Sequence, residues 1–266
     1  MKKKHLKKSI KYMMIGLVVV LIIVAIFLLK PSTNKQSTSG SSNEVEEVHE
    51  EYPYLSKWNE YHTINEDYIG TIRFDSGLID LPFVQGSDNT TYFRTNWQTM
   101  EYDDEGSIFL DSSNSLHDQN LILIGHYVYE SVDSTRTHMF TPLALLTSQE
   151  NYEANKSVKL YLENEIREYV VAYVYECPLI YEETDGETFY YAEDGYEFYY
   201  PNYTEDEFNQ YINTIKEHSY YDTGVELSYT DHLLTLQTCI ENADDKREIV
   251  VLKEVNRKEY WRSKIG

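Results

Sequence analysis

Beyond residue 66 the chain alternates short apolar runs with turn residues, a pattern typical of β-strands rather than of long helices. The turn tripeptide DSG, for example, separates the runs YIGTIRF and LIDLPFVQG. Many short strands with few helices favour a closed barrel or a sandwich over an alternating α/β sheet. Eight strands are predicted, over residues 68–74, 78–86, 106–111, 120–126, 157–162, 167–176, 232–239 and 248–255.

Three segments show helical rather than strand spacing. Residues 204–219 repeat apolar side chains at helical intervals, and Thr204 with Glu207 has the spacing of a capping box. Residues 139–146 predict a shorter helix. Residues 54–61 predict a helix packed on the core, with one apolar side formed by Tyr54, Leu55, Trp58 and Tyr61.

The N-terminal pattern differs from the rest of the chain. Residues 1–11 carry six lysines, and residues 12–29 carry no charge. At ~1.5 Å per residue this apolar run spans roughly 27 Å, close to the hydrocarbon thickness of a bilayer. The pattern predicts a cytoplasmic basic tail over 1–11, a transmembrane anchor over 12–29, an extracellular spacer over 30–52 and a folded domain over 53–266.

The expected localisation is therefore the cell membrane, with a single pass, a cytoplasmic N-terminus and an extracellular folded domain. A cleaved signal peptide is the competing interpretation. The apolar run is longer than a typical signal core, and no small-x-small cleavage motif follows it, so we favour the anchor.

Charge excludes one class of partner. The net charge is −22, and eight of the 23 Lys and Arg lie in residues 1–35, which contain no acid. The remaining 15 basic residues face all 45 Asp and Glu, so the folded domain should repel nucleic acid. We expect no cofactor and no metal, because the acidic runs EYDDEG and EETDGE lack the spacing of a calcium loop.

Three residues that can carry chemistry lie at the ends of apolar runs. His126 ends NLILIG, Cys239 ends LLTLQT, and Arg247 begins REIVVL. Each has an ordinary structural explanation when taken alone. A buried cysteine is usually inert, and a histidine at the end of a strand is usually solvated or hydrogen-bonded. Together they offer a thiolate nucleophile, a proton shuttle and a cation for an oxyanion, which are the groups that acyl transfer requires.

The second cysteine, Cys177, is expected to be a structural thiol. A Cys177–Cys239 disulfide is the alternative for a chain outside the cell. It conflicts with a nucleophilic Cys239, because an oxidised sulfur cannot attack a carbonyl.

Several segments resemble the sortases, the membrane-anchored cysteine transpeptidases of Gram-positive cell surfaces. TLQTC is similar to the TLxTC signature of that family, and LIGH resembles the segment that carries its histidine. The run RFDSGLIDLPFVQGSDNTTYF with GSIFLD, and the long insertion before LLTLQTC, resemble class B members. The resemblance covers roughly residues 53–255 and includes the order His, Cys, Arg.

This resemblance implies an eight-stranded sortase-type β-barrel with an N-terminal helix and a helical insertion before the cysteine strand. It implies Cys239 as nucleophile, His126 as acid/base residue and Arg247 as the oxyanion-stabilising or substrate-orienting residue. The sequence departs from the family at Tyr127, where Asn is expected, and at Gln237, where class B enzymes often place Ser. Lys246 competes with Arg247 for the cationic role, and Glu241 is a candidate for orienting His126 or Arg247.

The function implied is that of a sorting transpeptidase of the thiol-peptidase type. It would cleave a C-terminal sorting motif in secreted proteins through a thioester and transfer the protein to an amine of the peptidoglycan cross-bridge or its precursor. The alternatives are a pilin-polymerising sortase, a cell-wall cysteine hydrolase and a binding module with an inert thiol. Papain-like hydrolases usually place Cys before His, the reverse of the order found here. The sorting pentapeptide is left open.

Overall fold

The computed structural model describes residues 52–129, 135–184, 187–241 and 243–260, all of which belong to one compact unit. Its first part comprises helix α2 (Leu55–Ile64), strands β1 (Tyr68–Phe74), β2 (Asp80–Val84), β3 (Ile108–Leu110) and β4 (Asn120–Ile124), and the 3₁₀ helix η1 (Thr141–Thr147). The remaining elements are η2 (Gln149–Asn151), α3 (Tyr152–Asn155), β5 (Ser157–Tyr161), β6 (Glu165–Thr184), β7 (Glu187–Ala192), α4 (Glu205–His218), β8 (Leu233–Ile240) and β9 (Ala243–Glu259).

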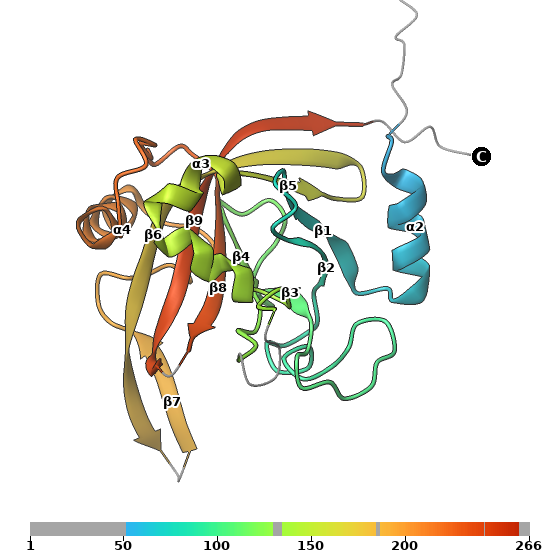
Figure 1. The fold of residues 1–266 in the computed structure, drawn as a ribbon, viewed down its shortest axis with the longest axis horizontal. Helices are drawn as coiled ribbons and strands as arrows, with labels where there is room; N and C mark the ends of the chain where they lie inside the picture. Colours follow the sequence, from blue (N-terminus) through green and yellow to red (C-terminus); the bar gives the residue numbers. More distant parts are fainter. Residues whose placement is uncertain (1–51, 130–134, 185–186, 242, 261–266) are drawn as a thin grey trace, which may run out of the picture. The chain divides into compact units, whose positions relative to one another are not determined.

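The strands form the expected closed barrel (Figure 1). Their order is β5-β1-β2-β3-β4-β8-β9-β6, and an additional β5–β6 pairing closes this ring of eight. A ninth strand, β7, pairs only with the outer part of β6. The prediction of a mainly β, eight-stranded barrel is confirmed.

Successive side chains of β8 and β9 point to opposite faces of the sheet and contribute to two different apolar clusters. Leu234 and Leu236 of β8 and Val250 and Leu252 of β9 belong to the cluster that fills the barrel. Their neighbours on the same strands point to the opposite face, where they pack beneath α4 in a second cluster that includes Leu233, Ile249 and Val251.

The helix α4 covers this outer face, as its sequence predicts. Thr204 accepts a hydrogen bond from the backbone N–H of Glu207, and the Glu207 carboxylate accepts one from the N–H of Thr204, which completes the capping box. Its buried side chains are the four apolar residues that recur at helical spacing, Phe208, Tyr211, Ile212 and Ile215.

On another side of the barrel, α2 packs through Trp58 against Tyr68 and Val84. The Trp58 indole N–H donates to the Ile69 carbonyl at 3.0 Å, which ties the helix to β1. The expected N-terminal helix is therefore present, over Leu55–Ile64.

The largest difference from the predicted strands lies at β6. The prediction ended this strand at Glu176, before a proline, whereas β6 continues to Thr184. It changes partner at that proline: β9 pairs with β6 as far as Pro178, and β7 pairs from Leu179 onward. The resulting β6–β7 hairpin extends beyond the barrel (Figure 1).

The prediction of a single-pass membrane protein requires correction. Among the described residues, no helix is both long enough and apolar enough to cross a bilayer. The longest of their α-helices, α4, has 14 residues and begins with acidic side chains. At ~1.5 Å per residue it measures about 21 Å, short of the roughly 30 Å of a hydrocarbon core. The segments 1–11 and 12–29, and the spacer up to residue 51, lie outside the described residues.

Candidate active site

Strand pairing sets two of the predicted catalytic positions opposite each other and brings the strand that leads to the third beside them. In the parallel β4–β8 pair Ile124 lies opposite Gln237, and the Gly125 N–H donates to the Gln237 carbonyl at 3.1 Å. The pairing of β4 ends there, and His126 follows two residues after Ile124, as Cys239 follows two residues after Gln237. In the antiparallel β8–β9 pair Cys239 lies directly opposite Arg247. Residues more than 100 positions apart in the chain thereby become neighbours.

Cys239 and Arg247 lie on the outer face of the barrel. Side chains whose positions on a strand differ by an even number point to the same face. Cys239 lies six positions after Leu233, and Arg247 lies two positions before Ile249. Leu233 and Ile249 both pack on the outer face. Directly opposite residues on paired strands project to the same face, with Cβ atoms roughly 4.5–5.5 Å apart. Cys239 and Arg247 therefore share one face, and we call the set His126, Cys239 and Arg247 the outer row.

His126 is half-buried, and the loop between β2 and β3 holds it in place. Its Nε2 lies 2.7 Å from the Phe93 carbonyl oxygen, and the two rings are 4.0 Å apart between centroids. Because a carbonyl only accepts, Nε2 carries the proton in the neutral ring and Nδ1 is the basic nitrogen. Burial lowers the pKa of His126, and the Arg94 guanidinium adds to this, against the opposing effects of the Phe93 hydrogen bond and Glu105.

The two cysteines have different environments. Both are free thiols, so the alternative of a Cys177–Cys239 disulfide is wrong. Cys177 is fully buried beneath α4, and burial raises the pKa of its thiol to about 12. Cys239 is only partly buried, at the end of β8. Of the two thiols, Cys239 is the one that reagents can approach.

Lys246 and Arg247, the two candidates for the cationic role, make different contacts. Lys246 Nζ forms an ion pair with Glu176 Oε2 at 2.7 Å. The Arg247 guanidinium donates to the Lys246 carbonyl at 2.7 Å, and its central carbon lies 6.0 Å from the centroid of the Tyr190 ring on β7. Because Arg247 occupies the position opposite Cys239, the geometry favours it over Lys246 as the cation of the outer row.

The Glu241 carboxylate is held by Arg136 and Tyr127. Its Oε2 accepts from Arg136 at 2.7 Å and from the Tyr127 hydroxyl at 3.2 Å. Tyr127, which departs from the family pattern, thus acts as a donor to the residue two positions past the cysteine. These contacts do not support an orienting role for Glu241 toward His126.

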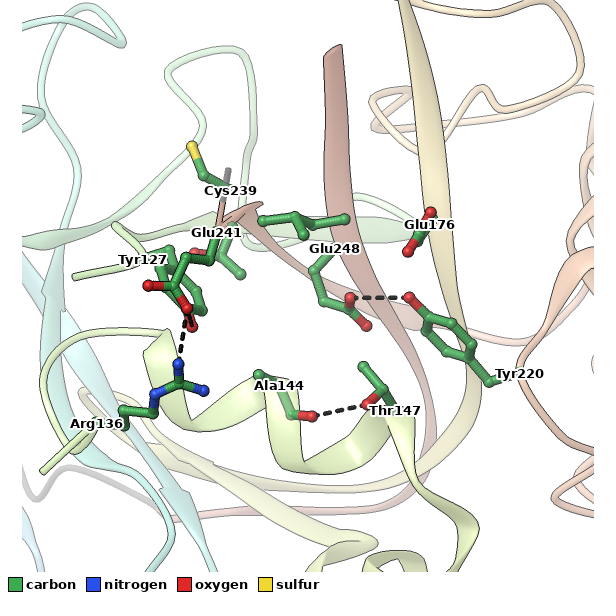
Figure 2. A pocket seen from close by; sticks show the side chains of 11 residues that line it. Tyr127, Arg136, Ala144, Thr147, Glu176, Tyr220, Cys239, Glu241 and Glu248 are labelled. Atoms are coloured by element: carbon green, nitrogen blue, oxygen red, sulfur yellow. Dashed lines mark hydrogen bonds and ion pairs between the residues drawn. The ribbon is translucent and has the colours of Figure 1, made fainter. Parts of the chain in front are cut away.

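A pocket of about 440 Å³ lies beside the cysteine, beneath η1 (Figure 2). Figure 2 shows the Cys239 sulfur pointing away from the Glu241–Arg136 and Glu248–Tyr220 pairs that line the pocket. The pocket is lined by Tyr127, Arg136, Ala144, Thr147, Glu176, Tyr220, Thr238, Cys239, Ile240, Glu241 and Glu248. Within the described ranges, no group of three or more His, Cys, Asp or Glu is arranged to hold a metal ion.

Sequence reasoning missed four residues around this site: Phe93, Arg94, Tyr190 and Glu248. Nothing in the run TTYFRTNW indicates that Phe93 would reach the histidine, because the contact depends on how a loop folds back. Glu248 did carry a signal. It shares its strand face with Val250 and Leu252, so alternation alone places this acid on the inward face.

Comparison with known proteins agrees with this geometry. No protein-family model matches the chain. Sortase B of Listeria monocytogenes is 28% identical over 217 residues, covering 81% of this chain and 77% of the relative. Sortase B of Staphylococcus aureus is 26% identical over 220 residues, covering 80% and 78%. The X-ray structure of Clostridium perfringens sortase B matches with a TM-score of 0.61 and 28% identity, over 74% of this chain and 99% of that one. By sequence and by fold, the chain is similar to the sortases, and to their class B members in particular.

Proposed function

We propose that this protein is a sorting transpeptidase whose catalytic residues are Cys239, His126 and Arg247, within a catalytic domain over residues 53–266. Similarity to sortase B proteins over about 80% of the chain supports cysteine transpeptidase chemistry. The observation that supports the assignment of residues is the strand pairing, which sets Cys239 directly opposite Arg247 and pairs β4, the strand that leads to His126, with the cysteine strand β8.

The first half-reaction forms a thioester. Because the lowered pKa of His126 keeps its ring neutral near pH 7, the basic nitrogen accepts the proton of the Cys239 thiol. The thiolate attacks the carbonyl carbon of the scissile peptide bond, and Arg247 stabilises the negative charge that develops on the oxygen. The C–N bond breaks, and the leaving amine takes the proton from His126.

The second half-reaction transfers the acyl group. An incoming amine attacks the thioester carbonyl, His126 takes a proton from it, and the C–S bond breaks. The proton then returns to the Cys239 sulfur, so the enzyme is unchanged and one amide bond has replaced another. We assign the donor as a secreted protein with a C-terminal sorting motif and the acceptor as a cell-wall amine.

Two solved sortase B structures support these substrate classes. One is the staphylococcal enzyme in a substrate complex, and another is a sortase B complexed with triglycine. They are 23% identical to this chain, so the exact motif and amine must be found by experiment.

The test is mass spectrometry of the full chain incubated with a library of sorting-type pentapeptides, with and without triglycine. We expect an acyl adduct at Cys239 that disappears when triglycine is added and yields an amide product. The Cys239→Ala variant should give neither species, and Cys177→Ser should give both. Hydrolysed peptide as the sole product, even with excess amine, would indicate a cysteine hydrolase instead. No adduct with any peptide would refute the proposal.

A further inference from the structure

A second row of polar side chains lies one residue along the same strands, on the opposite face from the outer row. Thr238 pairs with Glu248 across β8 and β9, and Glu248 pairs with Glu176 across β9 and β6. Directly paired residues share a face, so these three side chains point to the same side. All three line the pocket beneath η1 (Figure 2). We call them the inner row.

The inner row contains two polar atoms that are buried and have no hydrogen-bond partner among the described residues. They are Glu248 Oε1 and Thr238 Oγ1. The parent residues are only 4% and 2% exposed. The other carboxylate oxygen, Glu248 Oε2, accepts from the Tyr220 hydroxyl at 3.3 Å. Buried polar atoms in folded proteins nearly always have partners, so two unpartnered atoms on paired residues that line one pocket point to a group that binds there.

The charges around the pocket indicate the sign of that ligand. Its lining holds three carboxyl groups, Glu176, Glu241 and Glu248, and one guanidinium, Arg136. Arg136 is paired with Glu241 at 2.7 Å, and Glu176 is paired with Lys246 at 2.7 Å. Among the recorded ion pairs of the described residues, none involves Glu248, the most deeply buried of these acids. A cation is the ligand that this carboxyl would bind most strongly.

We propose that this pocket binds a primary ammonium group, with Glu248 Oε1 and Thr238 Oγ1 accepting its hydrogen bonds and Ala144 and Ile240 flanking its alkyl chain. An ammonium donates three hydrogen bonds, which suits two unpartnered acceptors at the end of a pocket with an apolar wall. Cys239 also lines the pocket, but its sulfur points away from the Glu248–Tyr220 pair, so the reacting atom does not face the ammonium position (Figure 2). Binding of an ammonium group does not depend on the proposed function.

Binding at this site should release a proton. Burial raises the pKa of Glu248 to about 8, with the Glu176 carboxylate adding to the rise and the Tyr220 hydrogen bond opposing it. Its carboxyl is therefore mostly protonated at pH 7 and must ionise to hold a cation. The other charged groups facing the pocket are the Glu241–Arg136 pair and Glu176 with Lys246, while η1 contributes the uncharged Ala144 and Thr147.

The affinity should accordingly rise between pH 6 and pH 8, about tenfold per pH unit at the lower end. It should level off once Glu248 is ionised, and fall only where the ligand loses its own proton, near the ~10.4 of an alkylamine such as lysine.

The experiment is titration calorimetry of the full chain with n-pentylammonium, in two amine-free buffers of different ionisation enthalpy. We expect saturable binding with release of close to one proton per ligand at pH 7. Glu248→Gln should weaken binding at least about tenfold and abolish proton release. Ala144→Leu, which extends a side chain into the pocket, should also remove binding, whereas Glu182→Gln on the β6–β7 hairpin should match the unsubstituted chain.

Three results would overturn the proposal. The first is no binding of pentylammonium up to about 10 mM at pH 8, a concentration that would still reveal a weak site with a dissociation constant of about 1 mM. The second is equal binding of 1-pentanol, which would show that the pocket recognises the alkyl chain rather than the charge. The third is binding that Glu248→Gln leaves unchanged while its thermal midpoint shows a folded protein. Loss of acyl transfer in any variant does not bear on these outcomes.

Discussion

The outer and inner rows occupy adjacent positions on the same strands, yet their environments differ completely. Cys239 and Arg247 project to the face flanked by the β2–β3 loop and the β6–β7 hairpin. Thr238 and Glu248, one residue away on each strand, point inward beneath η1 and are almost fully buried. Because successive side chains of a strand point to opposite faces, a shift of one residue separates a partly exposed thiol from a buried acid whose pKa is raised to about 8.

The difference shows how one pair of strands can carry two kinds of site. On the outer face, the Cys239 thiol is only partly buried. On the inner face, burial makes an unpaired carboxylate costly and therefore selective for a partner of opposite charge. Substitutions in the outer row should therefore change acyl transfer, whereas substitutions in the inner row should change how stability depends on pH.

The largest effect should come from the outer-row thiol. Cys239→Ala removes the atom that forms the thioester, so acyl transfer should fall by on the order of 10⁴ or more. The matched variant Cys177→Ser alters a thiol buried beneath α4 and should keep transfer within a few-fold, with a lower thermal midpoint. Steady-state peptide transfer with both variants makes the comparison. Comparable losses in the two would remove the distinction between them.

The next largest effect should come from the outer-row cation. Arg247→Gln removes the charge opposite Cys239, and kcat should drop roughly 10²–10³-fold, the cost of losing one oxyanion donor. Lys246→Gln, which only breaks the ion pair with Glu176, should change kcat less than about threefold, the scale of an exposed pair. If Lys246→Gln had the larger effect, the cationic role would belong to Lys246.

For the inner row we expect a pH-dependent effect on stability. Folding raises the pKa of Glu248 from 4.5 to about 8, so folding favours its protonated form. Its contribution is fully present below pH 4.5 and is lost as the pH rises toward 8, at roughly 1.4 kcal/mol per pH unit. Glu248→Gln keeps the shape of the neutral carboxyl but cannot ionise. The free energy of unfolding of this variant, relative to that of the unsubstituted chain, should therefore rise between pH 4.5 and pH 8 and stay constant at higher pH.

Urea denaturation at a series of pH values measures this difference. Glu182→Gln corrects for the general effect of removing one acid from a chain of net charge −22. A difference that stays flat with pH would mean that Glu248 is not protonated by folding.

The smallest effect concerns the glycine that precedes the outer-row histidine. A Cβ on Gly125 would lie 2.3 Å from Ile108 Cδ1 and 2.8 Å from the Phe140 ring. Gly125→Ala should therefore cost about 1–3 kcal/mol of stability through overpacking. At Gly86 the nearest atom to a new Cβ is 3.2 Å away, on the Tyr92 ring, so Gly86→Ala should cost less. Thermal unfolding of both variants tests which substitution costs more stability. A larger loss for Gly86→Ala than for Gly125→Ala would contradict this prediction.

The sequence predicted the fold well where the signal is local. The capping box at Thr204 and the apolar spacing of α4 are properties of a few consecutive residues, and both are present in the structure. The barrel strands were also found, because each carries its own apolar run. The continuation of β6 past Pro178 was missed, because it depends on a change of pairing partner that no local pattern records.

The candidate site divides in the same way. His126, Cys239 and Arg247 were predicted from strand ends and from resemblance to a family, but only the folded chain shows that Cys239 lies opposite Arg247 and that β4 pairs with β8. Phe93 reaches His126 from a loop 33 positions earlier, so only the folded chain shows the contact. Glu248 was overlooked beside Arg247, although its place among inward-facing apolar residues marks it as unusual.

The most direct test of the outer row compares the two thiols in one folded sample. Iodoacetamide labelling of the full chain, quantified by peptide mass spectrometry over time, reports both rates under identical conditions. Exposure of Cys239, set against the burial of Cys177, predicts at least about a hundredfold faster labelling of Cys239. Equal rates, or faster labelling of Cys177, would contradict the claim that Cys239 is the accessible nucleophile.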